Sequence, residues 1–329
     1  MKKVLRKVLK VILIVLAVVA VIVIALGLAS KQRSEKYYKY SNPVGEIEKQ
    51  YTPMGSYKVE KLEITSGDQQ IGRFVIYYPE AVEDSEEKYP VVLWANGTGS
   101  KSKTYTPFLK HLSSWGFIVV SNDDENTRTG ASLNAGIDML MAENEKSDSK
   151  LYQRIDLDRI GIGGHSQGGP AVFNMASVQP HADMIKTVYA VSATSSYHTR
   201  TFKDGWEYDI SKVHVPTLLT AGTGSFDAGT AESSDQESDE KAGIMQGICP
   251  LWSLQENFNL LPDDIDKAYF RKKNVDHGDS YLQFDAYMTA WFRWQLQGDE
   301  DAAKAFTGDS PEIMTNDLYQ DQEVNIEMK

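Results

Sequence analysis

The sequence predicts an α/β fold in which a mostly parallel central sheet carries helices on both faces. Short apolar runs, each long enough for one buried strand, alternate along the chain with stretches long enough for a helix. One such run, residues 155–163, leads into a Gly-rich turn and then into a further helical stretch. At 329 residues, the chain is long enough for one large domain with a sizeable core.

The N-terminal residues predict a membrane anchor. Residues 1–10 are basic, and residues 11–28 form an apolar run without a polar interruption. That length is at the short end of a membrane-spanning helix and is long for the core of a cleaved signal peptide. We therefore expect residues 1–30 to be an uncleaved transmembrane signal anchor, with the rest of the chain outside the cytoplasm. The alternative is a signal peptide cleaved after Ala29, followed by secretion. The polar residues 31–55 are expected to form a juxtamembrane linker.

The globular body is expected at residues 56–307. Residues 57–65 and 71–78 predict an antiparallel hairpin, because polar and apolar residues alternate in the first run and a Ser-Gly-Asp turn separates the two. The further predicted strands cover residues 89–95, 117–121, 155–163, 185–191, 215–221 and 268–273, and the predicted helices cover residues 106–115, 131–144, 171–177, 242–257 and 281–297. An insertion at about residues 229–262 and an acidic tail at residues 308–329 complete this organisation.

Composition narrows the range of functions. The formal net charge is −12, and five positive charges lie within the first ten residues, so the body is more acidic than the total suggests. Such a body argues against binding to nucleic acid, whose phosphates require basic surfaces. The single cysteine, Cys249, excludes an intramolecular disulfide, so the core must be stable without one.

A nucleophile motif lies at the end of the run at residues 155–163. Residues 164–168 read Gly-His-Ser-Gln-Gly and fit the Gly-x-Ser-x-Gly elbow, a sharp strand-to-helix turn that exposes the serine hydroxyl. The glycines are needed because side chains at those positions would clash in so tight a turn. We expect Ser166 at the carboxyl end of the sheet and the backbone N–H of Gln167 at a helix N-terminus, where it favours an oxyanion. The alternative is a Gly-rich turn with a surface serine.

A serine nucleophile needs a histidine base, which follows the acid in chains of this type. His277 comes just after the last predicted strand and therefore at the carboxyl edge, where ligands bind in open α/β sheets. His214 instead enters a strand at its amino end. His165 is adjacent to the serine but is expected to point away from it. We therefore assign the base to His277.

The acid is expected after the run at residues 215–221. Asp227 is the first carboxylate there and is our choice for orienting the histidine, although the segment before it is long. Glu232, Asp235 and Asp276 remain alternatives. A second oxyanion donor is expected from the Gly-rich loop at residues 96–99, with the N–H of Thr98 as the candidate and that of Gly99 as the substitute.

These motifs together resemble the α/β-hydrolases of the dienelactone-hydrolase-like group, and most of all bacterial cutinases and polyester (polyethylene-terephthalate) hydrolases. The matching segments, in chain order, are residues 55–59, 76–79, 89–93, 96–98, 114–120, 155–161, 164–168, 215–218 and 276–278. The resemblance implies the α/β-hydrolase fold, a triad of Ser166, Asp227 and His277, and oxyanion donors at Thr98 and Gln167.

The chain departs from that group in three places. The group's aspartate usually comes earlier, where this chain has Ser225. An aromatic residue at Thr98 and a tryptophan at residues 193–195 are missing, although both usually help to hold an aromatic polyester. The insertion at residues 229–262 lies where it could reshape substrate choice. Polyester cleavage is therefore not implied.

The sequence predicts a serine hydrolase that cleaves carboxylic esters through an acyl-enzyme, with a small-molecule, lipid or polymer ester as substrate. Such chemistry requires neither a metal nor an organic cofactor. Two alternatives remain: transfer of the acyl group to a cell-envelope acceptor, and a catalytically inactive binding module on the same fold.

Overall fold

The computed structural model describes residues 16, 35–202, 205–230 and 246–326. The chain divides into two compact units, Met1–Ser41 and Asn42–Lys329. In the first, only Leu16 and the segment containing a short 3-10 helix, η1 (Tyr37–Lys39), are described. Apart from Leu16, the predicted anchor at residues 1–30 lies outside the described residues. No helix in the described ranges combines the length and apolar character needed to cross a membrane.

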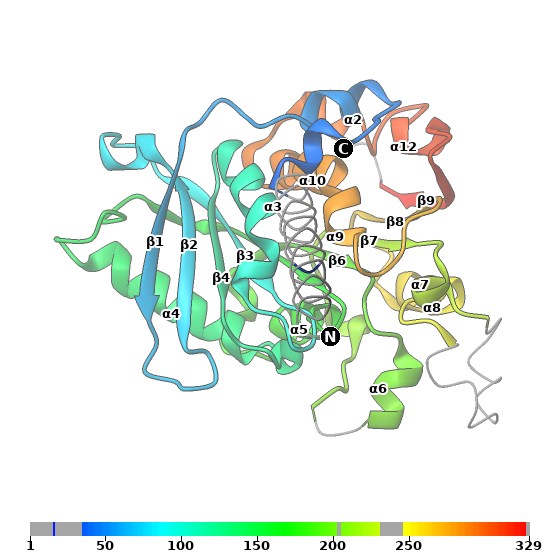
Figure 1. Ribbon diagram of the computed structural model, residues 1–329, viewed down its shortest axis with the longest axis horizontal. Helices are drawn as coiled ribbons and strands as arrows, with labels where there is room; N and C mark the ends of the chain where they lie inside the picture. The colour runs from blue at the N-terminus through cyan, green and yellow to red at the C-terminus, as the bar shows by residue number, and fades with distance from the viewer. Residues whose placement is uncertain (1–15, 17–34, 203–204, 231–245, 327–329) are drawn as a thin grey trace, which may run out of the picture. The chain divides into compact units, whose positions relative to one another are not determined.

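In the second unit, nine described strands form one mixed sheet in the order β1-β2-β4-β3-β5-β6-β7-β8-β9 (Figure 1). The strands from β4 to β8 in that order all run parallel, whereas the β1–β2, β2–β4 and β8–β9 pairs are antiparallel. The strands are β1 (Val59–Thr65), β2 (Arg73–Pro79), β3 (Tyr89–Ala95), β4 (Ile118–Asn122), β5 (Ile155–His165), β6 (Ile185–Val191), β7 (Thr217–Gly222), β8 (Lys267–Lys272) and β9 (Tyr319–Asn325). The predicted mostly parallel sheet is therefore confirmed.

Helices cover both faces of this sheet (Figure 1). They are α2 (Glu46–Tyr51), α3 (Ser102–Ser114), α4 (Ala131–Glu145), α5 (Gly168–Met175), α6 (Ser196–Phe202), α7 (Ser225–Ala228), α8 (Leu251–Leu260), α9 (Ser280–Gln283), α10 (Asp285–Gln297), α11 (Glu300–Ala303) and α12 (Glu312–Thr315). Successive residues of β3 show the two faces, because side chains alternate along a strand. Trp94 packs on Phe108 of α3 with ring centroids 4.5 Å apart, whereas Leu93 lies against Gly136 of α4.

Two predicted helices differ from the structure. The helix expected at residues 242–257 was predicted to begin too early: residues 246–250 are not α-helical, and α8 begins only at Leu251. Pro250 explains this start, since a proline disfavours helical backbone at the residue before it. The helix expected at residues 281–297 is interrupted at Phe284, which separates α9 from α10.

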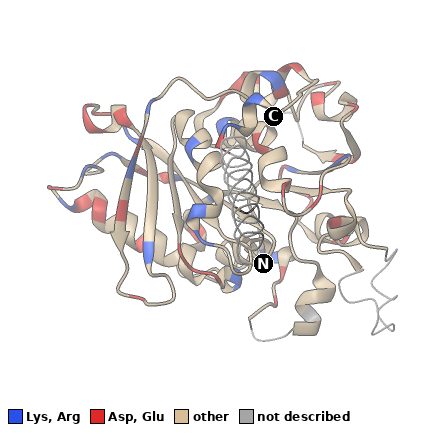
Figure 2. Ribbon diagram, in the orientation of Figure 1, with Lys and Arg blue, Asp and Glu red and all other residues tan. Residues whose placement is uncertain are grey.

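Both ends of the second unit are part of its packing. Residues 46–51 of the predicted linker form α2, and its Glu48 is 2% exposed. The acidic tail contributes β9, an edge strand that pairs antiparallel with β8. Sequence patterns did not indicate this strand because most of its side chains are polar. Acidic and basic side chains are spread over helices and loops of the described chain (Figure 2).

Candidate active site

Ser166 lies in the sharp turn between β5 and α5. Its φ is 60°, a left-handed backbone conformation that is rare for a residue with a side chain and marks strain at functional sites. A Cβ on Gly164 would overlap the carbonyl of Gly168, and a Cβ on Gly168 would overlap that of Ala95. The two glycines therefore allow the helix to lie this close to the strand, as the elbow motif predicts.

The other two candidate residues follow parallel strands at the same edge of the sheet. Ser166 follows β5, Asp227 lies in α7 after β7, and His277 lies in the loop after β8. His277 Nδ1 lies 2.8 Å from Asp227 Oδ1. The structure thus brings together an imidazole and a carboxylate that are fifty residues apart, at the end of the sheet that carries the elbow.

Asp227 is completely buried, and both of its carboxylate oxygens have partners. Oδ2 accepts a hydrogen bond from the backbone N–H of Gly222 at 2.8 Å and lies 2.6 Å from Ser192 Oγ. Ser192 itself has a φ of 49°. The sequence did not point to this serine, because nothing in residues 185–195 marks a hydroxyl that would reach a carboxylate in the segment after β7.

Asp276, an alternative acid, has a different role in the structure. Its Oδ1 accepts backbone N–H groups from Phe226 at 3.0 Å, from Asp227 at 2.9 Å and from His277 at 2.9 Å. Burial alone would raise the pKa of Asp276, but these three donors lower it below its ordinary value. Asp276 therefore fixes the two loops that carry Asp227 and His277. Glu232 and Asp235 lie outside the described residues.

His165, the residue before Ser166, contacts the loop that carries His277. The rings of His165 and His277 lie 4.6 Å apart, and His165 Nε2 lies 3.1 Å from the backbone carbonyl oxygen of His277. Within the part of the chain that the structure describes, Ser166 Oγ forms no hydrogen bond with the imidazole. Such bonds often form fully only once substrate is bound.

His165 points into the protein, toward the His277 loop. Its Nδ1 lies 3.1 Å from the hydroxyl oxygen of Tyr105, which accepts the backbone N–H of Gly97 at 2.7 Å. Burial, followed by the neighbouring His277, lowers the pKa of His165 to about 3. The role of Tyr105 was also missed, because a tyrosine within a helical stretch gives no sign of its polar partner.

The loop after β3 lies against the elbow, with Gly97 next to Ser166. The N–H of Gly97 is used by Tyr105, and that of Gly99 donates to the carbonyl of Glu125 at 3.1 Å. The N–H of Thr98 has no acceptor among the described residues, and the same holds for Gln167 at the start of α5. These are the two donors that the sequence analysis selected, whereas Gly99 is engaged elsewhere.

The rim of the site carries one exposed aromatic ring. Phe226 is 42% exposed and meets the His277 ring edge to face, with centroids 5.3 Å apart. At the position where a tryptophan was expected, Ala193 is 4% exposed, and a Cβ on Gly169 would overlap it. An apolar surface therefore lies beside the imidazole, supplied by the loop after β7.

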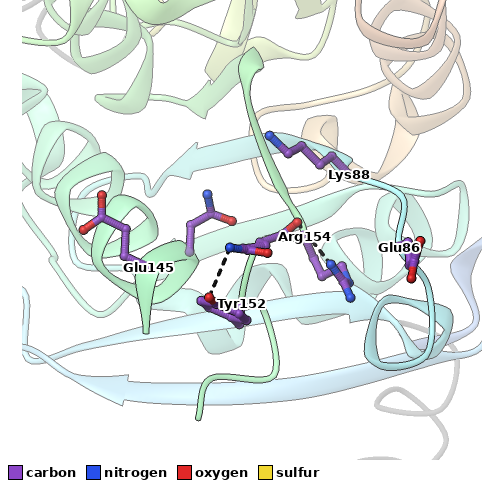
Figure 3. Close-up of a pocket in the computed structure, with 7 residues that line it drawn as sticks. Glu86, Lys88, Glu145, Tyr152 and Arg154 are labelled. Carbon is purple, nitrogen blue, oxygen red and sulfur yellow. Dashed lines mark hydrogen bonds between the residues drawn. The ribbon is translucent and has the colours of Figure 1, made fainter. Parts of the chain in front are cut away.

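A surface cavity of about 740 Å³ opens at the other end of the sheet, where β3 and β5 begin (Figure 3). Charged and polar side chains line it: Glu86, Lys88, Asn144, Glu145, Tyr152, Gln153 and Arg154. Because the candidate triad lies at the carboxyl edge, this cavity is separate from the site.

Comparisons with known proteins agree with this geometry. A family model described as PET hydrolase-like matches residues 32–323. Cutinase est1 of Thermobifida alba is 23% identical over 255 residues, covering 76% of this chain and 72% of that protein. Cutinase 2 of Thermobifida cellulosilytica is 23% identical over 241 residues, or 71% of this chain and 77% of that protein.

A further relative has a terephthalate ester in its name. Bis(hydroxyethyl) terephthalate hydrolase of Streptomyces coelicolor is 25% identical over 257 residues, covering 74% of this chain and 69% of that protein. The family match spans the sheet, the elbow and both loops that approach it. The chain therefore belongs to the PET hydrolase-like family of α/β hydrolases, as its resemblance to cutinases and polyester hydrolases predicted.

Proposed function

We propose that this protein is a serine hydrolase that cleaves carboxylic esters through a Ser166–His277–Asp227 triad. The observation that carries the proposal is the 2.8 Å contact between Asp227 Oδ1 and His277 Nδ1 beside an elbow whose serine has a φ of 60°. Relatives named as cutinases and as a terephthalate ester hydrolase support the same class of substrate.

In the proposed reaction, Ser166 Oγ attacks the ester carbonyl while His277 Nε2 takes its proton. Asp227 holds the imidazole through Nδ1 and stabilises the imidazolium that forms. The backbone N–H groups of Thr98 and Gln167 stabilise the tetrahedral oxyanion. His277 then donates the proton to the leaving alcohol, and water, activated by the same imidazole, releases the acid from the acyl-enzyme.

The site favours esters with an apolar acyl portion, because Phe226 is exposed next to His277. The residues that this chain has at Thr98 and at 193–195 do not supply the aromatic clamp of polyester hydrolases. We therefore propose soluble or lipid-like carboxylic esters as substrates. We further propose that residues 1–30 anchor the enzyme in the membrane with its catalytic domain outside the cytoplasm.

Labelling with a fluorophosphonate probe tests the function directly. We expect the purified protein to be labelled at one site and Ser166→Ala to lose the label and the hydrolysis of a short p-nitrophenyl ester while it keeps its circular dichroism spectrum. Labelling that persists in Ser166→Ala would reject the nucleophile. A panel that includes bis(hydroxyethyl) terephthalate, assayed with and without an acyl acceptor, separates hydrolysis from acyl transfer.

A further inference from the structure

A chain of hydrogen bonds joins the two loops on either side of Ser166. The N–H of Gly97 donates to Tyr105 Oη at 2.7 Å, and this oxygen lies 3.1 Å from His165 Nδ1. His165 Nε2 lies 3.1 Å from the carbonyl oxygen of His277. This series of hydrogen bonds therefore begins at Gly97, the residue before Thr98, and ends at the backbone carbonyl of His277.

The direction of each bond is fixed by the chemistry of the groups. A neutral imidazole has one N–H and one acceptor nitrogen, and the low pKa of about 3 keeps His165 neutral near pH 7. A carbonyl oxygen only accepts, so Nε2 carries the hydrogen and Nδ1 accepts from the Tyr105 hydroxyl. The tyrosine oxygen then accepts from Gly97. The hydrogen bonds between these three residues and the His277 carbonyl therefore all run in one direction.

Close packing leaves the groups of this hydrogen-bond chain little freedom to shift. Tyr105 is 1% exposed and His165 is 7% exposed. A Cβ on Gly97 would come within 3.1 Å of His165 Nδ1 and 3.3 Å of Ser166 Cβ, so the loop lies directly against the elbow. Since protein interiors are close-packed, a displaced Tyr105 hydroxyl moves the Gly97 backbone and with it the adjacent N–H of Thr98.

We propose that Tyr105 and His165 are positioning residues that hold the Thr98 N–H and the His277 imidazole in a fixed relation to Ser166. This inference rests on the proposed esterase function. Neither residue needs to touch substrate, because Tyr105 acts through Gly97 and His165 acts through the backbone of His277. Oxyanion donors and bases accelerate a reaction only when they are held in place beforehand.

The carbonyl of His277 also accepts from the hydroxyl of Ser280 at 3.1 Å. Loss of the His165 bond therefore leaves the carbonyl of His277 with one of its two donors. The oxyanion loop has no such substitute at Gly97, whose N–H depends on Tyr105. We therefore expect loss of the tyrosine hydroxyl to weaken stabilisation of the transition state more than binding of the substrate.

The test is Tyr105→Phe, which keeps the ring that packs on Trp94 and Phe108 and removes only the hydroxyl. We expect kcat for a short p-nitrophenyl ester to fall about 10- to 100-fold, with KM changed less than about threefold. Affinity for a phenylboronic acid, which forms a tetrahedral adduct with the serine, should fall in parallel with kcat. A purely structural role would instead lower the melting temperature and leave both values unchanged.

Tyr281→Phe is the matched control. The Tyr281 ring lies 5.0 Å from that of Tyr105 and 5.3 Å from that of His165, yet its hydroxyl has no hydrogen bond in the described part of the chain. We expect this variant to keep wild-type kcat and boronate affinity. A loss equal to that of Tyr105→Phe would show that any hydroxyl removed from this cluster has the same effect, and the proposal would be rejected.

A double variant tests whether the two residues act in one chain. If Tyr105 acts partly through His165, Tyr105→Phe should reduce kcat less in a His165→Gln background than in the wild type.

Tyr105→Phe with wild-type kcat and boronate affinity would overturn the positioning role alone. Wild-type protein that fluorophosphonate does not label at Ser166 would overturn the esterase function, and the present inference with it.

Discussion

The Asp227 carboxylate is completely buried, and its two oxygens have three hydrogen-bond partners. A buried carboxylate is costly unless hydrogen bonds replace its lost hydration. Here the N–H of Gly222 and the hydroxyl of Ser192 bind Oδ2, which leaves Oδ1 for His277 Nδ1. The arrangement holds the carboxylate in place beside His277 Nδ1.

Replacing this anion by an amide tests the assignment of the acid. Asp227→Asn presents either an NH₂ group or a neutral oxygen to His277 Nδ1, so the tautomer that accepts the serine proton is no longer favoured. We expect kcat to fall by about 10⁴-fold, as in other Ser-His-Asp triads, while the circular dichroism spectrum is retained. Turnover of a short p-nitrophenyl ester measures this.

Asp276→Asn is the comparison variant. Its Oδ1 can still accept backbone N–H groups, although without a charge, and it does not contact the imidazole. We expect a loss of activity far smaller than that of Asp227→Asn. The reverse order, with Asp276→Asn nearly inactive and Asp227→Asn active, would move the acid to Asp276.

Residues of the site differed in how well local sequence could predict them. Ser166 lies in a turn that is determined by five consecutive residues, so the motif alone predicts its strained backbone. Asp227 was selected by chain order, and its contact with His277 agrees with that choice. Ser192 and Tyr105 contribute through hydroxyls that meet partners thirty-five and sixty residues away, and no local pattern encodes such meetings.

At the scale of elements, strands were predicted more accurately than helices. The runs at residues 89–95 and 185–191 coincide with β3 and β6, because a strand buried in a parallel sheet is mostly apolar. The helix expected at residues 242–257 was predicted to begin too early, since its apolar spacing continues across Pro250, whereas α8 begins after that proline. β9 was not predicted because its stability comes from its neighbour β8 rather than from its own composition.

Tyr319 shows how this polar edge strand is held. Its ring meets those of Phe270 and Tyr287 at 5.4 Å and 5.2 Å, and its hydroxyl donates to Glu48 Oε1 at 2.7 Å. We expect Tyr319→Ala to lower the free energy of unfolding by about 3–5 kcal/mol, the usual cost of truncating a buried aromatic side chain. Urea unfolding measures the change.

Tyr319→Phe separates packing from hydrogen bonding at the same position. It keeps the ring and leaves Glu48 without one donor, so we expect a loss of about 1.5–3 kcal/mol, the range for a hydrogen bond to a charged group. If both variants unfolded at the wild-type urea concentration, β9 would contribute nothing to the stability of the sheet.

At the scale of the whole folded unit, buried charges connect segments that are distant in sequence. Glu48 of α2 binds Lys272 of β8 at 3.1 Å and accepts the Tyr319 hydroxyl of β9. His111 of α3 likewise connects distant segments, because its Nδ1 lies 2.7 Å from Asp285 Oδ2 of α10. Its Nε2 lies 3.0 Å and 2.8 Å from the carbonyl oxygens of Thr52 and Pro53.

His111 gives the unit a predictable response to pH. Burial by itself lowers its pKa, but the charge of Asp285 and the surrounding acceptors raise the pKa above 6.5. Nδ1 faces the Asp285 carboxylate and Nε2 faces two carbonyl oxygens, so the fold favours the imidazolium over the neutral ring. A folded-state pKa above the unfolded value means that this stabilisation is complete below pH 6.5 and is lost as pH rises through the folded-state value.

We therefore expect the free energy of unfolding to decline from about pH 6.5 upward in the wild type and to decline less steeply in His111→Gln. Urea unfolding at about pH 5.5, 7 and 8.5 measures the two slopes. His181→Gln is the control, because His181 forms only a partly exposed pair with Asp138, and such pairs contribute little. Equal slopes in wild type and His111→Gln would show that the His111 imidazole, which links α3 to α10 and to residues 52–53, does not carry the expected proton in the folded protein.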